Sequence, residues 1–183
     1  WWQKHMQLFV DEKVTIDIIT EVASTRLKLR EKAEDFFSLV HQNQIPLLIF
    51  SAGVGDLIRI HLESKSLITD NVHIISNFFE FKDGVAVGTK KPIVAAASKD
   101  EASVKETPFA SEIIERKNAI LMGDKIEDLQ MAHGIEHDTL LTIGFLNEND
   151  PVVRDAFLAN FDIVIEGDGS LESINELLKS IIS

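Results

Sequence analysis

Residues 119–128 read Ala-Ile-Leu-Met-Gly-Asp-Lys-Ile-Glu-Asp, an apolar run that ends in Gly123-Asp124 and is followed by Asp128. A buried strand with this ending places a carboxylate at the edge of a sheet, and carboxylate oxygens are preferred ligands of Mg²⁺. In the alternative interpretation, Asp124 caps the next helix and Asp128 lies in its first turn, where the helix dipole favours negative charge. We favour a metal site, because a charge directly after four apolar residues is costly without a function.

Strand-like and helix-like segments alternate on both sides of this stretch. Such alternation predicts an α/β domain with a doubly wound parallel sheet covered by helices. Ligands of these sheets bind at the carboxyl ends of the strands, so we expect Ser51 and Asp124 to face one crevice. A β-hairpin is expected over 79–87, with Asp83-Gly84 as its turn. The other expected segments are strands at 47–50, 72–76, 119–122, 139–143 and 162–165, and helices at 15–30, 31–42, 56–64, 126–134, 150–160 and 171–182.

The strand at 47–50 runs into Ser51-Ala52-Gly53-Val54-Gly55-Asp56. A hydroxyl group and successive backbone N–H groups ahead of a helix are suited to binding a phosphate. Taken alone, this pattern favours the alternative of an ordinary strand-to-helix turn with Asp56 as the helix cap. Lys99 could neutralise a phosphoryl group, although without further context it is better interpreted as a solvated loop lysine.

Composition narrows the choice of partners and of compartment. The net charge of −12 disfavours a nucleic-acid partner, because an acidic chain gains nothing from counterion release. The chain has no cysteine, which excludes disulfides, Cys-ligated zinc and a cysteine nucleophile and fits a cytoplasmic protein. The longest apolar runs are too short to span a bilayer, so no membrane association is expected. No feature predicts an oligomeric state.

Several motifs in this order resemble the haloacid dehalogenase superfamily and, within it, the cytosolic pyrimidine 5′-nucleotidase (type III) family. The resemblance implies Mg²⁺-dependent hydrolysis of pyrimidine nucleoside 5′-monophosphates, in which an aspartate attacks phosphorus and water then hydrolyses the aspartyl-phosphate. It also implies a haloacid dehalogenase-like core with part of a helical cap. The segments that carry it are Leu48–Asp56, Ser76–Phe79, Ser98-Lys99, Leu121–Ala132 and Ile143–Asn147.

The resemblance also implies how the phosphate is bound. Ser51 matches the phosphate-binding serine of the second motif, and Ala52 and Gly53 supply backbone contacts. Lys99 matches the lysine that stabilises the phosphoryl group and the attacking carboxylate. Ser51 and Lys99 are therefore the expected catalytic residues of this chain.

The same resemblance implies which residues bind the metal ion and the nucleotide. Asp124 matches the Mg²⁺ ligand, and Asp128 is the second acidic residue of that site. His5 lies near the position of a cap residue that contacts the nucleotide. Lys125 departs from the family, which more often has a small polar residue there, and a cation beside the metal ligand would weaken Mg²⁺ binding unless it points away.

The first motif of the family, Asp-x-Asp followed by Thr or Ser, is absent. This motif supplies the nucleophile. It lies on the central strand of the sheet, between the strands that carry Ser51 and Asp124. We therefore expect a fragment of a longer enzyme, with a partial cap at residues 1–30 and a core at residues 31–183 that lacks its first strand. We expect negligible activity from the chain alone. The alternatives are a non-catalytic nucleotide-binding or dimerisation module of the same fold, or another haloacid dehalogenase-type phosphatase.

Overall fold

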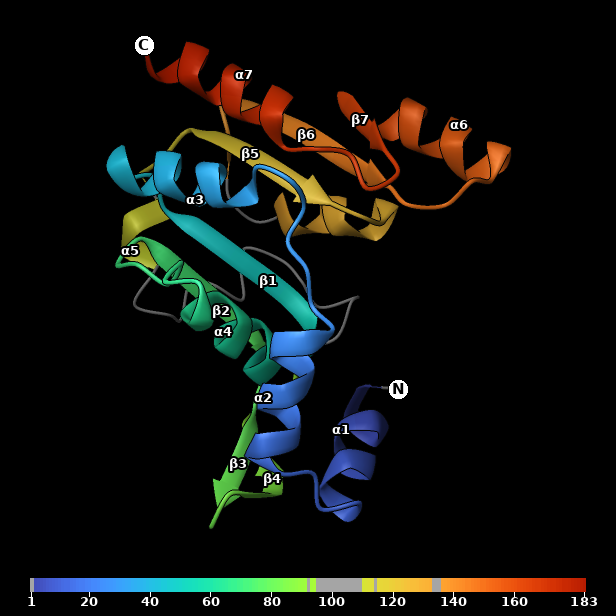
Figure 1. The fold of residues 1–183 in the computed structure, drawn as a ribbon. Helices are drawn as coiled ribbons and strands as arrows, with labels where there is room; N and C mark the ends of the chain where they lie inside the picture. Colours follow the sequence, from blue (N-terminus) through green and yellow to red (C-terminus); the bar gives the residue numbers. More distant parts are fainter. Residues whose placement is uncertain (1, 92, 95–109, 114, 133–135) are drawn as a thin grey trace. The chain divides into compact units, whose positions relative to one another are not determined.

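The chain divides into two compact units in the computed structural model, and Figure 1 shows their helices and strands. The first unit comprises residues 1–95 and 172–183, and the second comprises residues 96–171. The structure describes residues 2–91, 93–94, 110–113, 115–132 and 136–183.

A strand–helix–strand motif forms the centre of the first unit. Strands β1 and β2 are parallel, with Leu47 opposite Val72, and the helix α4 connects them. The register shifts between Phe50 and Val54, so the end of β1 departs from regular pairing. The elements of this unit are α1 (Trp2–Asp11), α2 (Ile16–Thr25), α3 (Ala33–Gln42), β1 (Leu47–Val54), α4 (Gly55–Ser64), β2 (Val72–Asn77), β3 (Phe79–Lys82), β4 (Val85–Thr89) and α7 (Glu172–Ile182).

The predicted hairpin is confirmed as the antiparallel pair β3–β4. Asp83 and Gly84 both have positive φ, 52° and 78°, which the tight turn requires and which glycine adopts without strain. The connection between α1 and α2 pairs with the hairpin, because the Ile16 N–H donates to the Gly84 carbonyl and the Ala86 N–H donates to the Val14 carbonyl, both at 2.9 Å. The two N-terminal helices are thereby attached to the hairpin.

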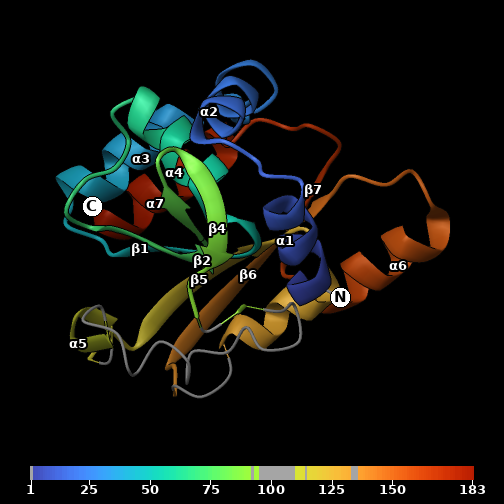
Figure 2. The ribbon, with the colours of Figure 1, turned by 90° about the horizontal axis from the view of Figure 1, so that it is seen from below.

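Apolar side chains from these same elements form a small core. Met6, Ile19, Phe79 and Ala86 are buried together, and each is at most 4% exposed. Figure 2 shows α1 beside β4. At another place in the unit, α7 packs on α3, where the Asn175 amide donates to the Lys32 carbonyl at 3.0 Å.

The second unit is a three-stranded parallel sheet in the order β5-β6-β7. The strand β6 extends to Leu146 and is longer than predicted. The segment predicted as a helix over 126–134 is a 3₁₀ helix over 126–132, and its expected end at Gly134 lies outside the described residues. The elements are α5 (Ala110–Ile113), β5 (Asn118–Gly123), η3 (Ile126–Ala132), β6 (Thr139–Leu146), α6 (Pro151–Asn160) and β7 (Ile163–Glu166).

Two kinds of interaction stabilise this sheet. Leu121, Leu146, Phe157 and Phe161 form its buried apolar cluster. At the start of β7, the Asp162 carboxylate accepts hydrogen bonds of 2.8 Å from both the N–H and the hydroxyl of Thr142. These hydrogen bonds lower the pKa of Asp162 below its usual 3.8.

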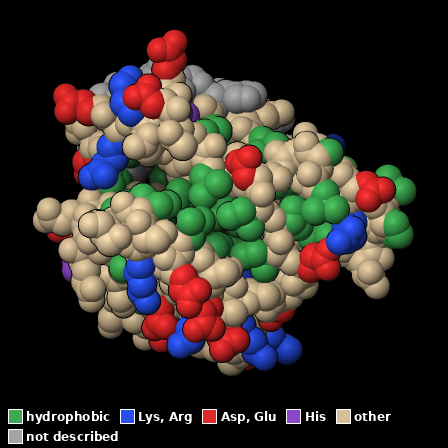
Figure 3. All heavy atoms as spheres, turned by 90° about the horizontal axis from the view of Figure 1, so that it is seen from above, with side chains coloured by type: hydrophobic (Ala, Val, Ile, Leu, Met, Phe, Trp, Pro, Cys, Tyr) green, Lys and Arg blue, Asp and Glu red, His purple; other side chains and the backbone are tan. Residues whose placement is uncertain are grey.

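The observed strands confirm the predicted α/β class with parallel sheets. In the described part of the chain, β1 pairs only with β2 and β5 only with β6, so one edge of each has no neighbouring strand. None of the described helices combines the length and apolar character of a membrane span. Acidic and basic side chains are interspersed on the face that Figure 3 shows.

Candidate active site

The predicted phosphate-binding segment lies at the end of β1, where the strand pairing becomes irregular. The Ser51 hydroxyl oxygen accepts a hydrogen bond of 3.1 Å from the Gly53 N–H, across buried Ala52. The hydroxyl hydrogen of Ser51 is not used in that bond. The hydroxyl group therefore keeps a hydrogen that it can rotate toward an oxyanion and donate.

Two side chains of the neighbouring strand β2 donate hydrogen bonds to the backbone of this segment. The Asn77 amide donates to the Ala52 carbonyl at 2.7 Å, and the Ser76 hydroxyl donates to the Gly53 carbonyl at 3.1 Å. Asn77 is fully buried and also exchanges two hydrogen bonds with the Val94 backbone, at 2.7 and 2.9 Å. The sequence motifs assign Asn77 no role in the site. The feature that could have indicated one is the polar pair Ser76-Asn77 at the end of the strand next to the phosphate-binding segment.

Asp56 does not cap α4, which corrects the interpretation that its position in sequence suggests. The residue at the cap position is Val54, which makes no side-chain cap. Asp56 is 2% exposed, and its carboxylate accepts a 2.8 Å hydrogen bond from the Phe79 N–H. A second contact, at 3.4 Å, joins it to Arg59. Asp56 thus links the first turn of α4 to the start of the hairpin.

The second predicted segment follows β5 and is organised by Asp128. This residue is buried, and its Oδ2 accepts hydrogen bonds from the N–H groups of Asp124 and Lys125, at 3.1 and 3.2 Å. A Cβ added at Gly123 would lie 2.6 Å from the Asp128 Cβ, so only glycine allows this close approach. Asp128 therefore fixes the turn that carries Asp124.

Asp124 is exposed at the carboxyl end of β5. Within the described ranges, no group of three or more His, Cys, Asp or Glu side chains is placed to hold a metal ion. Mg²⁺ usually takes only one or two protein carboxylates and completes its shell with water and substrate phosphate. An exposed carboxylate on a fixed turn fits that partial ligand set.

The predicted site residues are distributed over the two units. Ser51, Ala52 and Gly53 form one segment of the first unit, whereas the acidic pair lies in the second. His5 is half-buried on α1, with its ring centroid 6.2 Å from that of Trp2. Lys99 lies outside the described residues.

The fold is that of the haloacid dehalogenase-like phosphatases. A phosphoserine phosphatase crystallised in its apo form has a similar structure, with a TM-score of 0.65 at 19% identity over 95% of this chain and 78% of that one. The chain belongs to the pyrimidine 5′-nucleotidase (UMPH-1) family, whose model matches residues 1–182. This confirms the family that the sequence motifs indicate.

Relatives at higher identity are named as nucleotidases. The chain is 34% identical over 185 residues to the 7-methylguanosine phosphate-specific 5′-nucleotidase of Mus musculus, and all of it aligns with 62% of that protein. It is 30% identical over 184 residues to the protein of the same name from Drosophila melanogaster, covering 99% of this chain and 58% of the relative. The chain thus spans less than two thirds of the length of these relatives.

A solved structure agrees with the sequence relatives. Cytosolic 5′-nucleotidase IIIB bound to cytidine has a TM-score of 0.83 at 28% identity. It aligns with the whole of this chain, which covers 62% of that structure.

Proposed function

We propose that this chain carries the phosphate-binding and metal-binding parts of a Mg²⁺-dependent 5′-nucleotidase that hydrolyses nucleoside 5′-monophosphates. The family match over residues 1–182 carries the proposal. The arrangement of the 51–53 segment supports it, because that segment is fixed by hydrogen bonds from β2 before any ligand binds. A cytoplasmic setting is part of the proposal and is supported by the absence of cysteine.

In this proposal, the Ser51 hydroxyl and the nearby backbone N–H groups bind the phosphoryl oxygens. Asn77 acts on the site through Ala52, so it is a positioning residue. Lys99 neutralises charge on the phosphoryl group as it is transferred. His5 contacts the nucleoside, in a position where the neighbouring Trp2 ring offers a surface for stacking.

The proposed metal ligand is Asp124, with Asp128 as the second acidic residue of the site. One oxygen of Asp128 already accepts two backbone hydrogen bonds, so its clearest contribution is to hold the Asp124 turn in place. Bound Mg²⁺ would offset negative charge on the phosphoryl oxygens. Lys125 is exposed beside Asp124, and its ammonium would compete with the metal for that carboxylate if the two approached.

The nucleophilic carboxylate is assigned to residues outside this sequence, because the Asp-x-Asp motif does not occur in it. Attack of that carboxylate on phosphorus releases the nucleoside, and water then cleaves the aspartyl-phosphate to give inorganic phosphate. The chain alone should therefore bind nucleotide but turn it over negligibly.

The names of the relatives define which nucleotides to test. Both relatives described above are named for 7-methylguanosine phosphate, and the similar structure of cytosolic 5′-nucleotidase IIIB holds cytidine. Cytidine monophosphate, uridine monophosphate and 7-methylguanosine monophosphate are thus the substrates to compare.

Thermal unfolding with each nucleotide and Mg²⁺ tests the proposal. We expect the midpoint to rise with nucleotide concentration, because a ligand that binds only the folded state stabilises it. The rise should disappear in Ser51→Ala and persist in Ser38→Ala, which removes an exposed hydroxyl group from α3. If the unfolding midpoint of Ser51→Ala rises with each nucleotide as much as that of the parent chain, the assignment of the 51–53 segment is wrong.

A non-catalytic nucleotide-binding module of the same fold is the second candidate. Both candidates predict nucleotide binding, and release of phosphate separates them. If the longer protein that contains the missing strand binds nucleotide without releasing phosphate, the module interpretation is correct.

A further inference from the structure

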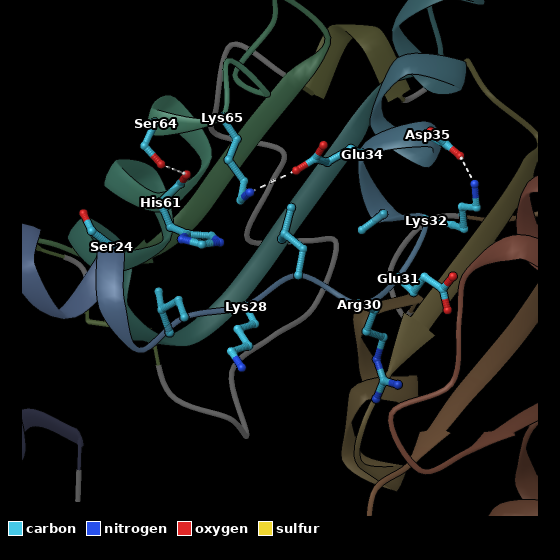
Figure 4. A pocket seen from close by; sticks show the side chains of 13 residues that line it. Ser24, Lys28, Arg30, Glu31, Lys32, Glu34, Asp35, His61, Ser64 and Lys65 are labelled. Atoms are coloured by element: carbon cyan, nitrogen blue, oxygen red, sulfur yellow. Dashed lines mark hydrogen bonds and ion pairs between the residues drawn. The ribbon is translucent and has the colours of Figure 1, made fainter.

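The first unit contains a cavity of about 690 Å³ at some distance along the chain from the 51–53 segment. It lies where the connection between α2 and α3 passes the last turn of α4. Figure 4 shows the His61 ring pointing from α4 toward this cavity, with Lys65 and Lys28 on either side of it in that view. None of the predicted site residues that the structure describes lines the cavity.

His61 has an unusual hydrogen-bonding state. It is 7% exposed, and its Nδ1 lies 2.8 Å from the Ala23 carbonyl oxygen. A carbonyl only accepts hydrogen bonds, so Nδ1 must carry a hydrogen, and in the neutral ring Nε2 is then an acceptor. Nε2 is buried and has no hydrogen-bond partner. Unpartnered buried nitrogen atoms are rare in folded proteins, so this atom calls for a donor.

The charges around the cavity favour an anion. Lys28, Arg30, Lys32 and Lys65 line it together with three acidic residues, a net positive wall on a chain whose overall charge is −12. Two of the lysines are paired within the wall, Lys65 with Glu34 at 2.9 Å and Lys32 with Asp35 at 3.2 Å. Lys28 has no such pairing in the described part of the chain and remains available to a ligand.

We propose that this cavity binds the phosphoryl group of a small molecule, as a second site separate from the 51–53 segment. The anionic oxygens would face the Lys28 ammonium. A hydroxyl group of the ligand would donate to His61 Nε2 once the imidazole ring turns to bring this buried atom to the cavity wall. Inorganic phosphate meets both needs because it keeps a P–OH at neutral pH. A phosphorylated sugar also meets them through its own hydroxyl groups. Sulfate has the shape and charge but no hydrogen to donate.

Side-chain nitrogen NMR of the ¹⁵N-labelled chain measures the proposed contact directly. We titrate inorganic phosphate, ribose 5-phosphate and sulfate at constant ionic strength and follow the His61 Nε2 resonance. A saturable shift with either phosphate probe, with at least tenfold weaker binding of sulfate, is the expected result. The phosphate probe that binds more tightly identifies whether the natural ligand is the free ion or a phosphorylated molecule.

Matched variants separate this site from the proposed active site. Loss of one charge-assisted contact should weaken binding roughly tenfold in Lys28→Ala. Lys179→Ala removes an exposed lysine of α7 outside the cavity and should leave the affinity unchanged. Ser51→Ala should also leave the His61 shift unchanged, so this proposal can succeed or fail independently of the nucleotidase proposal.

Three results would overturn the proposal. One is the absence of a saturable shift with either phosphate probe. Another is equal binding of sulfate, which would show that His61 accepts no hydrogen bond from the ligand. The last is a shift that Ser51→Ala abolishes while Lys28→Ala preserves it, which would place the bound anion at the 51–53 segment.

Discussion

The Asn77 side chain donates a 2.7 Å hydrogen bond to the backbone carbonyl of Ala52, 25 residues earlier in the chain. The same side chain exchanges two further hydrogen bonds with Val94, so one buried amide connects β1, β2 and the segment after β4. The shape of the proposed phosphate-binding segment, residues 51–53, therefore depends on a residue that lies outside that segment.

Replacement of this amide should be costly. Asn77→Ala leaves the Ala52 carbonyl and both backbone groups of Val94 without their partner, and we expect the free energy of unfolding to fall by about 2–4 kcal/mol. Urea denaturation measures this loss. Asn160→Ala, which removes one exposed hydrogen bond at the end of α6, is the control and should change stability by less than about 0.5 kcal/mol. Equal effects of the two substitutions would show that the Asn77 network contributes nothing.

Gly123 and Asp128 lie so close together that substitutions at the two positions should have coupled effects on stability. Gly123→Ala places a Cβ 2.6 Å from the Asp128 Cβ and should destabilise the chain by about 1–3 kcal/mol through overpacking. Gly88→Ala is the control, because the nearest atom to its added Cβ, at 3.1 Å, is a carboxylate oxygen at the flexible end of Glu80. A double-mutant cycle with Asp128→Gly tests the cause, since only glycine at 128 removes the Cβ that the added methyl group would meet. Strict additivity in the cycle would contradict a direct clash.

Asp162 should make stability depend on acid pH. Hydrogen bonds from Thr142 lower the pKa of the Asp162 carboxyl in the folded state, so its stabilisation is complete above the unfolded value of 3.8. That stabilisation is lost as the pH falls through the lower folded value. Unfolding free energies measured below pH 4 should decline less steeply in Asp162→Asn than in the parent chain. Asp155→Asn, an exposed change on α6, should leave the decline unaltered.

Asp124 should be required for any effect of Mg²⁺ on nucleotide binding. We expect Mg²⁺ to strengthen nucleotide-induced thermal stabilisation in the parent chain but not in Asp124→Asn. Glu127→Gln, which neutralises an exposed carboxylate three residues away, should behave like the parent. If Glu127→Gln loses the response as well, general negative charge rather than a ligand at Asp124 explains it.

Much of the fold follows from local sequence, because its signals act over a few residues. The Asp83-Gly84 pair predicts the hairpin, since few residues tolerate the backbone angles of that turn. The apolar strands and the Pro151 helix are likewise predicted by pattern and by capping chemistry. The type of helix at 126–132 is not, because a 3₁₀ and an α-helical turn place similar residues inward over so short a segment.

The supports of the site are harder to predict from sequence. Asp56 has the sequence position of a helix cap, and only the path of the chain after β2 brings the Phe79 N–H within 2.8 Å of it. The unpaired nitrogen of His61 has no sequence signal either, since it depends on the packing of α2 against α4. Tertiary contacts of this kind override what local preference indicates.

The connection between α1 and α2 forms an isolated antiparallel bridge with the hairpin, with Thr15 opposite Val85, and adds the hydrogen bond from the Ala86 N–H to the Val14 carbonyl at its edge. A two-stranded ribbon on its own is marginally stable in water. Displacement of the first two helices would thus remove hydrogen bonds from one edge of the β3–β4 ribbon, and the protection of the Ala86 amide against hydrogen exchange would report the free energy of that detachment.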